Sequence, residues 1–262
     1  MSPALQSLLW GSVSGGALVY SGANWLLASQ GAKHRKLSGE QQPSEQEDAG
    51  SGTAIAVVAA IFLLTSIRLT RGDPAHFGVA LGGLLEPATD DQSAGPLGLF
   101  DLGRAIRKAL PSAALELGMA TVVAAVVFPL YAVGFYWWNQ PAGDFSLVLP
   151  PNIASFVVAQ LIVIALPEEA FFRGYLQTSL SDLTNRRVRV LGVELAPGAW
   201  LLQAALFAVI HFLVDPQLAR LAVFFPALLF GWTRAWRGGI GAALALHAMS
   251  NLYSEILARS WL

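Results

Sequence analysis

The feature that most limits the possible folds is a series of long apolar segments with few charged residues or none. A helix needs about 20 mostly apolar residues to cross the hydrocarbon core of a membrane. Within that core only helices and closed barrels satisfy their backbone hydrogen bonds. Charged residues make up 13% of the chain, against about 25% in soluble domains. The pattern therefore predicts an all-α fold, a polytopic transmembrane helical bundle.

We expect about eight spans, of which the third is short; if the third does not cross the membrane, the orientation of everything before it is reversed. They cover residues 4–28, 53–67, 76–87, 115–138, about 152 to beyond 174, 199–214, 218–236 and 239–257. This divides the chain into N-terminal transmembrane segments over residues 1–112, with a polar linker over residues 33–52, and a helical core over residues 113–262.

Clusters of basic residues predict how the bundle is oriented. Lys and Arg in short loops favour the cytoplasmic side of a membrane. With eight spans, all four clusters fall on that side and both termini fall outside; the clusters are at residues 33–36, 104–108, 186–189 and 234–237. We therefore expect a multi-pass protein of the inner (cytoplasmic) membrane of a bacterial cell, with the lipid bilayer around it.

Composition and motifs exclude several classes of function. The chain has no cysteine, which excludes thiol nucleophiles and cysteine-ligated metals. A net charge of −1 does not fit a basic nucleic-acid binder, so we expect no nucleic acid among its partners. No His-Glu-x-x-His helix for zinc is present either.

Ionisable side chains inside the last four predicted spans are the candidates for function. Such groups cost roughly 2.5–3.5 kcal/mol each on insertion scales, so they are rare and mark functional sites. The set is Glu168, Glu169, Arg173, His211, His247 and Glu255, with Asn251 as a companion amide.

Helical spacing assigns different surroundings to the two adjacent glutamates. Residues four apart share a helix face, so Glu169 and Arg173 can pair. Glu168 lies about 100° further round the helix, on the stripe of Phe171 and Tyr175. The spacing suggests that Glu169 is held as structure and that Glu168 acts as a general base. The alternative for the Glu169–Arg173 pair is a purely structural role as an ion pair at a helix end, and the sequence favours neither interpretation.

The two histidines have polar or aromatic neighbours at the same spacing. His211 follows Phe207 by four residues, and Asn251 follows His247 by four. The simpler interpretation of His211 alone is a polar residue at the membrane interface. The simpler interpretation of His247 and Asn251 alone is a hydrogen bond between membrane helices. Burying all three polar helix faces together would produce one polar pocket within the bilayer.

Three motifs resemble those of the CPBP family, the CAAX prenyl endopeptidases and bacteriocin-processing (Abi) intramembrane proteases. They are "EEAFFR", "FAVIH" and "HAMSN", matching the family patterns EExxxR, FxxxH and HxxxN in order. The resemblance implies a glutamate-dependent peptidase in which Glu168 and His211 activate water. It further implies that His247 and Asn251 stabilise the oxyanion, with Glu169 and Arg173 in support.

The resemblance also implies a substrate and leaves a cofactor question open. We expect a membrane-anchored protein cut near its C-terminus, and the N-terminal half is similar to the myxosortase branch, which processes C-terminal sorting signals. We expect no cofactor and no metal; a zinc ion on Glu168, His211 and His247 is the less favoured alternative. A proton or divalent-cation transporter and a catalytically silent membrane scaffold are the competing functions.

Overall fold

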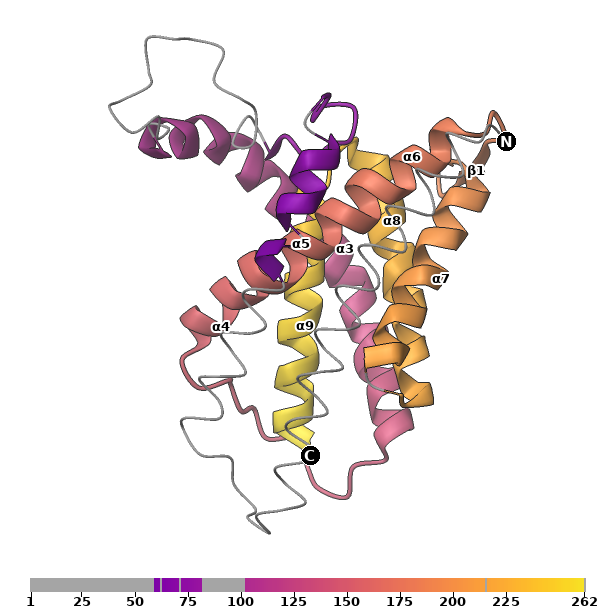
Figure 1. The fold of residues 1–262 in the computed structure, drawn as a ribbon. Helices are drawn as coiled ribbons and strands as arrows, with labels where there is room; N and C mark the ends of the chain where they lie inside the picture. Colours follow the sequence, from indigo (N-terminus) through magenta and orange to yellow (C-terminus); the bar gives the residue numbers. More distant parts are fainter. Residues whose placement is uncertain (1–58, 62, 71, 82–101, 215, 262) are drawn as a thin grey trace, which may run out of the picture.

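The computed structural model describes residues 59–61, 63–70, 72–81, 102–214 and 216–261, which form a helical bundle with one small hairpin (Figure 1). The structure confirms the predicted fold class, because the described residues are mostly helical. The first predicted span and the polar linker lie outside the described residues. The boundary predicted between residues 112 and 113 falls inside a helix, α3, and stays a prediction.

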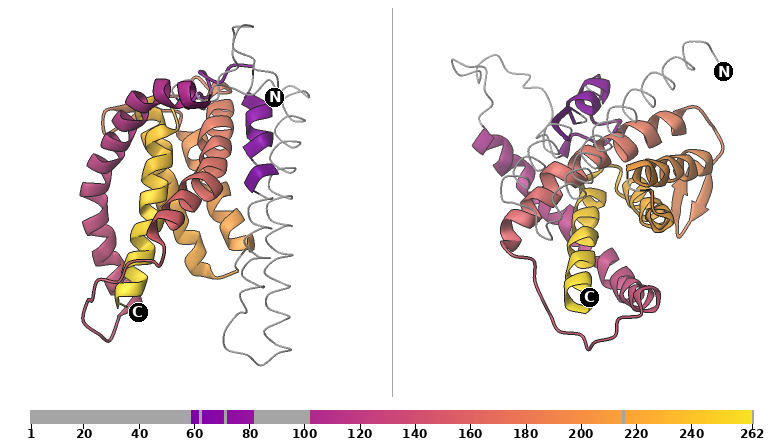
Figure 2. Two further views of the ribbon diagram at one scale, coloured as in Figure 1. Left: turned by 90° about the vertical axis from the view of Figure 1, so that its left-hand side faces the viewer. Right: turned by 60° about the horizontal axis from the view of Figure 1, so that its bottom comes forward.

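From residue 102 to residue 261, the described chain runs back and forth between the two ends of the bundle. The first crossing is α3 and the second is a composite helix from α4 to α6; a hairpin leads to α7, α8 and α9 (Figures 1 and 2). The bounds are α3 Leu102–Asn139, α4 Ile153–Ala159, η2 Gln160–Ala165, α5 Leu166–Glu169, η3 Ala170–Leu176, α6 Gln177–Asp182, β1 Val188–Val190, β2 Val193–Leu195, α7 Pro197–Val214, η4 Leu218–Val223, α8 Phe224–Arg237 and α9 Gly241–Trp261.

Four helices in the described part are long and apolar enough to cross a membrane. They cover Arg107–Asn139, Ile153–Asp182, Pro197–Val214 and Leu218–Arg237, and they match the fourth to seventh predicted spans. The predicted span 239–257 is also helical, as α9, but its composition is too polar for that group. A shorter apolar helix, Ala59–Thr70, overlaps the predicted span 53–67. The predicted count of about eight is not confirmed.

The prediction of a span over residues 76–87 is wrong for residues 76–81, which form turns rather than a membrane helix. Gly78 takes a left-handed backbone conformation with φ of 69°, which ends helical propagation. The Gly78 carbonyl accepts a hydrogen bond from the Ile240 N–H at 2.9 Å. The segment is therefore packed against the α8–α9 connection, and residues 82–87 lie outside the described part.

Three of the predicted basic clusters lie at one end of the bundle. The start of α3, the β1–β2 hairpin and the end of α8 are all at the top of Figure 1, whereas the α3–α4 connection and the C-terminus are at the bottom. The described helices thus alternate as the predicted orientation requires. Trp137 and Trp138, at the lower end of α3, are largely exposed, as expected for side chains in a membrane interface.

Small residues allow the helices around the candidate site to approach closely. At Gly231 on α8, an added Cβ would lie 2.7 Å from Gln177 Oε1 and 2.7 Å from Gln203 Nε2. The Gln177 amide donates to the Gly231 carbonyl at 2.9 Å, so α6 and α8 are joined at this point. Glycine therefore sets the distance between α8 and the helix that carries the two glutamates.

We predict that Gly231→Ala destabilises the protein by about 1–3 kcal/mol, because the new methyl group has no space and overpacking costs energies of that order. Thermal unfolding of the purified protein in detergent measures the effect as a lower midpoint. Gly134→Ala is the matched control, since a Cβ there meets nothing within 4 Å. An unchanged midpoint for Gly231→Ala would contradict the close approach.

Candidate active site

The two adjacent glutamates lie in a helix with unusual backbone hydrogen bonding. On either side of α5, the π-helical segments η2 and η3 form bonds from residue i to residue i−5, such as Leu166 N to Leu161 O and Gln177 N to Phe172 O. Pro167, at the start of α5, has no N–H to donate. π-helical turns are rare and occur frequently at functional sites. Glu168 and Glu169 thus lie between two widened turns.

Glu169 and Arg173 form the predicted ion pair. Arg173 Nη1 lies 3.0 Å from Glu169 Oε1, and both side chains are 0% exposed. The guanidinium also lies over the rings of Phe207 and Phe230, at 4.4 and 5.2 Å from their centroids, and donates to the Ala227 carbonyl at 3.4 Å. The arginine therefore connects the glutamate helix with α7 and α8.

His247 on α9 contacts both glutamates. Its Nδ1 lies 2.7 Å from Glu169 Oε1 and its Nε2 lies 3.7 Å from Glu168 Oε2. The carboxylate of Glu169 can only accept, so Nδ1 carries the hydrogen of the first contact. The ring is stacked on Phe230 with centroids 4.8 Å apart. The contact with Glu169 joins residues 78 positions apart, which helical spacing alone does not reveal.

Asn251 lies one turn after His247 on α9 and has a partner that the sequence analysis did not assign to the site. Its Nδ2 donates to Gln160 Oε1 at 2.8 Å. Gln160 lies at the start of η2 and is the only amide in the apolar stretch 153–166. An isolated polar residue in a span is itself a signal of function, and it could have identified Gln160.

His211 lies apart from the glutamates, on α7. Its Nδ1 lies 2.9 Å from the Phe207 carbonyl. A carbonyl only accepts, so Nδ1 donates and a neutral His211 has its lone pair on Nε2. The predicted contact with Phe207 is present, with ring centroids 4.3 Å apart.

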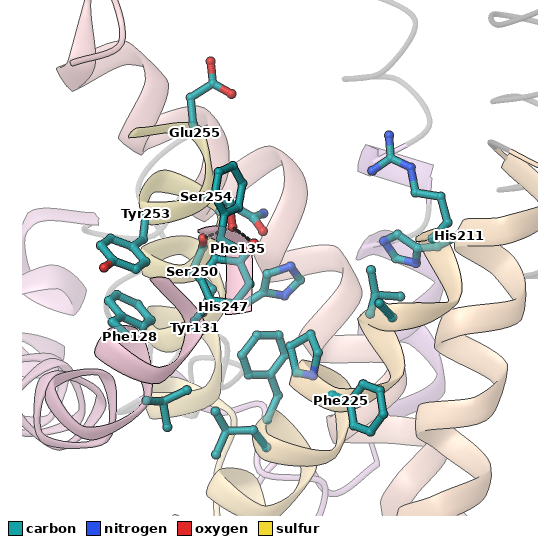
Figure 3. A pocket seen from close by; sticks show the side chains of 18 of the residues that line it. Phe128, Tyr131, Phe135, His211, Phe225, His247, Ser250, Tyr253, Ser254 and Glu255 are labelled. Carbon is teal, nitrogen blue, oxygen red and sulfur yellow. Dashed lines mark hydrogen bonds between the residues drawn. The ribbon is translucent and has the colours of Figure 1, made fainter. Parts of the chain in front are cut away.

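One large cavity brings the two histidines to a shared space. It has a volume of about 1150 Å³ and lies between α3, η2, α7, α8 and α9. Figure 3 shows His247 and His211 on opposite sides of it, with Ser250 and Ser254 on the same helix as His247. The polar side chains in the lining are Gln160, His211, Gln217, Arg220, His247, Ser250, Asn251, Ser254 and Glu255, with the hydroxyl-bearing Tyr131 and Tyr253. Glu168, Glu169 and Arg173 are absent from the lining, since they lie behind His247.

Comparison with known families identifies the C-terminal part of the chain. Residues 150–253 match the model of the type II CAAX prenyl endopeptidase Rce1-like family. The chain has a CAAX endopeptidase domain. Members of this family are peptidases, so the chain is a hydrolase of that class. No curated protein and no solved structure matches the chain.

The matched range contains all three motifs and most of the cavity wall. It begins just before α4 and ends in α9, so Gln160, Glu168, His211, His247 and Asn251 all belong to the CAAX endopeptidase domain. The resemblance derived from the three motifs is confirmed at the level of the family. The myxosortase branch stays a prediction.

The side chains of this domain do not form a clear metal site. Zinc in a catalytic site takes three protein ligands at about 2.0–2.2 Å for nitrogen and oxygen. In the part of the chain that the structure describes, no three His, Asp or Glu side chains are grouped closely enough to hold a metal ion. The alternative ligand set Glu168, His211 and His247 is not drawn together as one such group in this arrangement, and the choice between a metal-free site and zinc stays a prediction.

We predict that Arg173→Met destabilises the CAAX endopeptidase domain by about 3–5 kcal/mol, because removing one partner of a buried ion pair leaves the other charge uncompensated. Denaturant titration in mixed micelles measures the free energy of unfolding. Arg259→Met is the matched control: it removes a half-exposed i,i+4 pair with Glu255, which contributes about 1 kcal/mol or less. Equal effects of the two substitutions would refute a structural role for Arg173.

Proposed function

We propose that the chain is an intramembrane endopeptidase of the glutamic type that hydrolyses a peptide bond near the C-terminus of a membrane-anchored protein. The observation that carries the proposal is the contact between Glu168 and His247 at the wall of a cavity that also contains His211 and Asn251. Two histidines and an amide then line one space within the bundle, and the Glu168 carboxylate lies next to one of these histidines.

Glu168 is proposed to activate the attacking water. Its Oε2 is 3.7 Å from His247 Nε2, which is too long for a direct hydrogen bond, and the proposal places the attacking water beside this pair. Glu168 takes a proton from that water while the oxygen bonds to the substrate carbonyl carbon. The same proton then goes to the leaving amine nitrogen as the C–N bond breaks.

His211 acts from the opposite wall. Its Nε2 carries the lone pair when the ring is neutral, because Nδ1 donates to the Phe207 carbonyl. In the proposal the attacking water lies in the cavity between the two walls, where the His211 imidazole helps to orient it or to move its proton. The proposal thus assigns water activation to Glu168 and His211 together.

His247 and Asn251 are proposed to stabilise the negative oxygen of the tetrahedral intermediate. Donors fixed in advance where charge develops lower the barrier, and removing one costs about 10²–10³ in kcat. The proposal places the His247 ring and, one turn later on α9, the Asn251 amide beside that oxygen. Glu169 supports it by accepting from Nδ1, and Arg173 holds Glu169 in turn.

The substrate follows from the place of the cavity in an apolar bundle. A site between membrane helices is reached by a segment that is itself in or on the membrane, and the family match supports a membrane-associated protein substrate. We propose the bacterial inner membrane as the location. A C-terminal sorting signal is the substrate that the resemblance to the myxosortase branch favours.

We predict that Glu168→Gln abolishes cleavage while the folded protein is retained, because the amide keeps the shape of the side chain and cannot take a proton from water. The measurement compares membrane proteomes of wild-type and variant cells for C-terminal tails that persist only in the variant. Glu194→Gln, an exposed change on β2, is the matched control and leaves the tails processed. If Glu168→Gln cells process every tail, the peptidase role of Glu168 is lost, and transport or a silent scaffold gains support.

We also predict that activity survives removal of divalent metal ions, because the described His, Asp and Glu side chains are not grouped as ligands. Purified protein is treated with a chelator, dialysed and assayed on a fluorogenic peptide carrying a lipid anchor. Cleavage at the untreated rate is the expected result. Loss of cleavage that added zinc restores would favour the zinc alternative.

A further inference from the structure

Gln160 has no role in the mechanism above, yet its polar side chain lines the cavity. It occupies the first position of η2, where the composite helix changes to i→i−5 hydrogen bonding. Its side chain lines the same cavity as His211, His247 and Asn251. An amide in an apolar membrane segment is costly unless it has a hydrogen-bonding partner, and here that partner is the amide of Asn251.

The bond between the two amides fixes how Asn251 is turned. A side-chain amide has two N–H donors on one nitrogen and an acceptor oxygen on the other arm. The 2.8 Å bond from Asn251 Nδ2 to Gln160 Oε1 uses one donor and sets the amide plane. The second N–H on the same nitrogen then has a fixed direction relative to α9.

Other side chains on this face of α9 cannot replace that donor. The hydroxyl of Ser250 donates to the Leu246 carbonyl at 2.7 Å, and that of Ser254 lies 2.8 Å from the Ser250 carbonyl. A hydroxyl has one hydrogen to donate, so bonds to the helix backbone use it. Among Ser250, Asn251 and Ser254, Asn251 is therefore the side chain with a donor left for the cavity.

We infer that Gln160 is a positioning residue for Asn251: its carbonyl oxygen holds the asparagine amide so that the remaining N–H is directed at the developing oxyanion. The inference rests on the proposed role of Asn251 in peptide hydrolysis. Gln160 acts through Asn251, so removing it lowers the rate of the chemical step and leaves substrate binding unchanged.

A double-mutant cycle tests this inference, because residues that act through one another are not additive. The variants are Gln160→Leu, Asn251→Ala and both together, assayed for kcat and KM in nanodiscs on a lipid-anchored fluorogenic peptide. We expect Asn251→Ala to lower kcat about 100-fold and Gln160→Leu to lower it about tenfold through misplacement of the donor, with KM unchanged. The double variant should be no slower than Asn251→Ala alone.

Two further variants separate positioning from packing. Gln160→Glu keeps an acceptor oxygen for Asn251, so its kcat should stay within about threefold of wild type if positioning is the role. Phe156→Leu changes another cavity-lining residue on α4, and its effect should add fully to that of Asn251→Ala. Unfolding midpoints in detergent check that every variant is folded.

Additive losses for Gln160→Leu and Asn251→Ala would overturn the inference and leave the proposed function intact. An Asn251→Ala variant with wild-type kcat would overturn the inference together with the assigned role of Asn251. A folded Glu168→Gln variant with full activity would instead remove the proposed function itself, and this is measured in the same assay.

Discussion

The buried contact between Arg173 and Glu169 is the interaction on which the rest of the site depends. Both side chains are 0% exposed, and separating them would leave a charge in the dry interior at a cost of several kcal/mol. Arg173 also contacts the Ala227 carbonyl on α8 and the ring of Phe207 on α7, and Glu169 contacts His247 on α9. One ion pair therefore connects four helices and fixes their relative positions around the cavity.

Sequence reasoning succeeded for interactions within one helix. The Glu169–Arg173 and Phe207–His211 contacts follow from four-residue spacing, and the apolar segments predicted where the long helices lie. It could not find contacts between helices, because spacing carries no information about which faces meet. The His247–Glu169 and Asn251–Gln160 bonds, 78 and 91 residues apart, are of that kind.

Apolar length alone also failed to distinguish a span from a packed turn. Residues 76–81 were included in a predicted span, but Gly78 adopts a left-handed conformation and its carbonyl binds Ile240. The turn at Gly78 thus depends on a hydrogen bond with a residue near the other end of the chain, which the local sequence does not reveal. Conversely, α9 is helical as expected and is more polar than the other long helices, because one of its faces lines the cavity.

The exposure of the side chains in the candidate site increases from the ion pair to the cavity wall. Arg173 and Glu169 are fully buried, Glu168 and His247 are 3% and 5% exposed, and Asn251 and Gln160 are partly buried on the cavity wall. The buried charges of Arg173 and Glu169 thus lie where a partner and low dielectric make their attraction strong, and the two amides lie on the cavity wall. The adjacent glutamates have different partners because a rotation of about 100° per residue directs Glu169 to the arginine and leaves Glu168 near His247 Nε2. The proposed mechanism needs that division, since a carboxylate held by Arg173 cannot also leave its partner to take a proton from water.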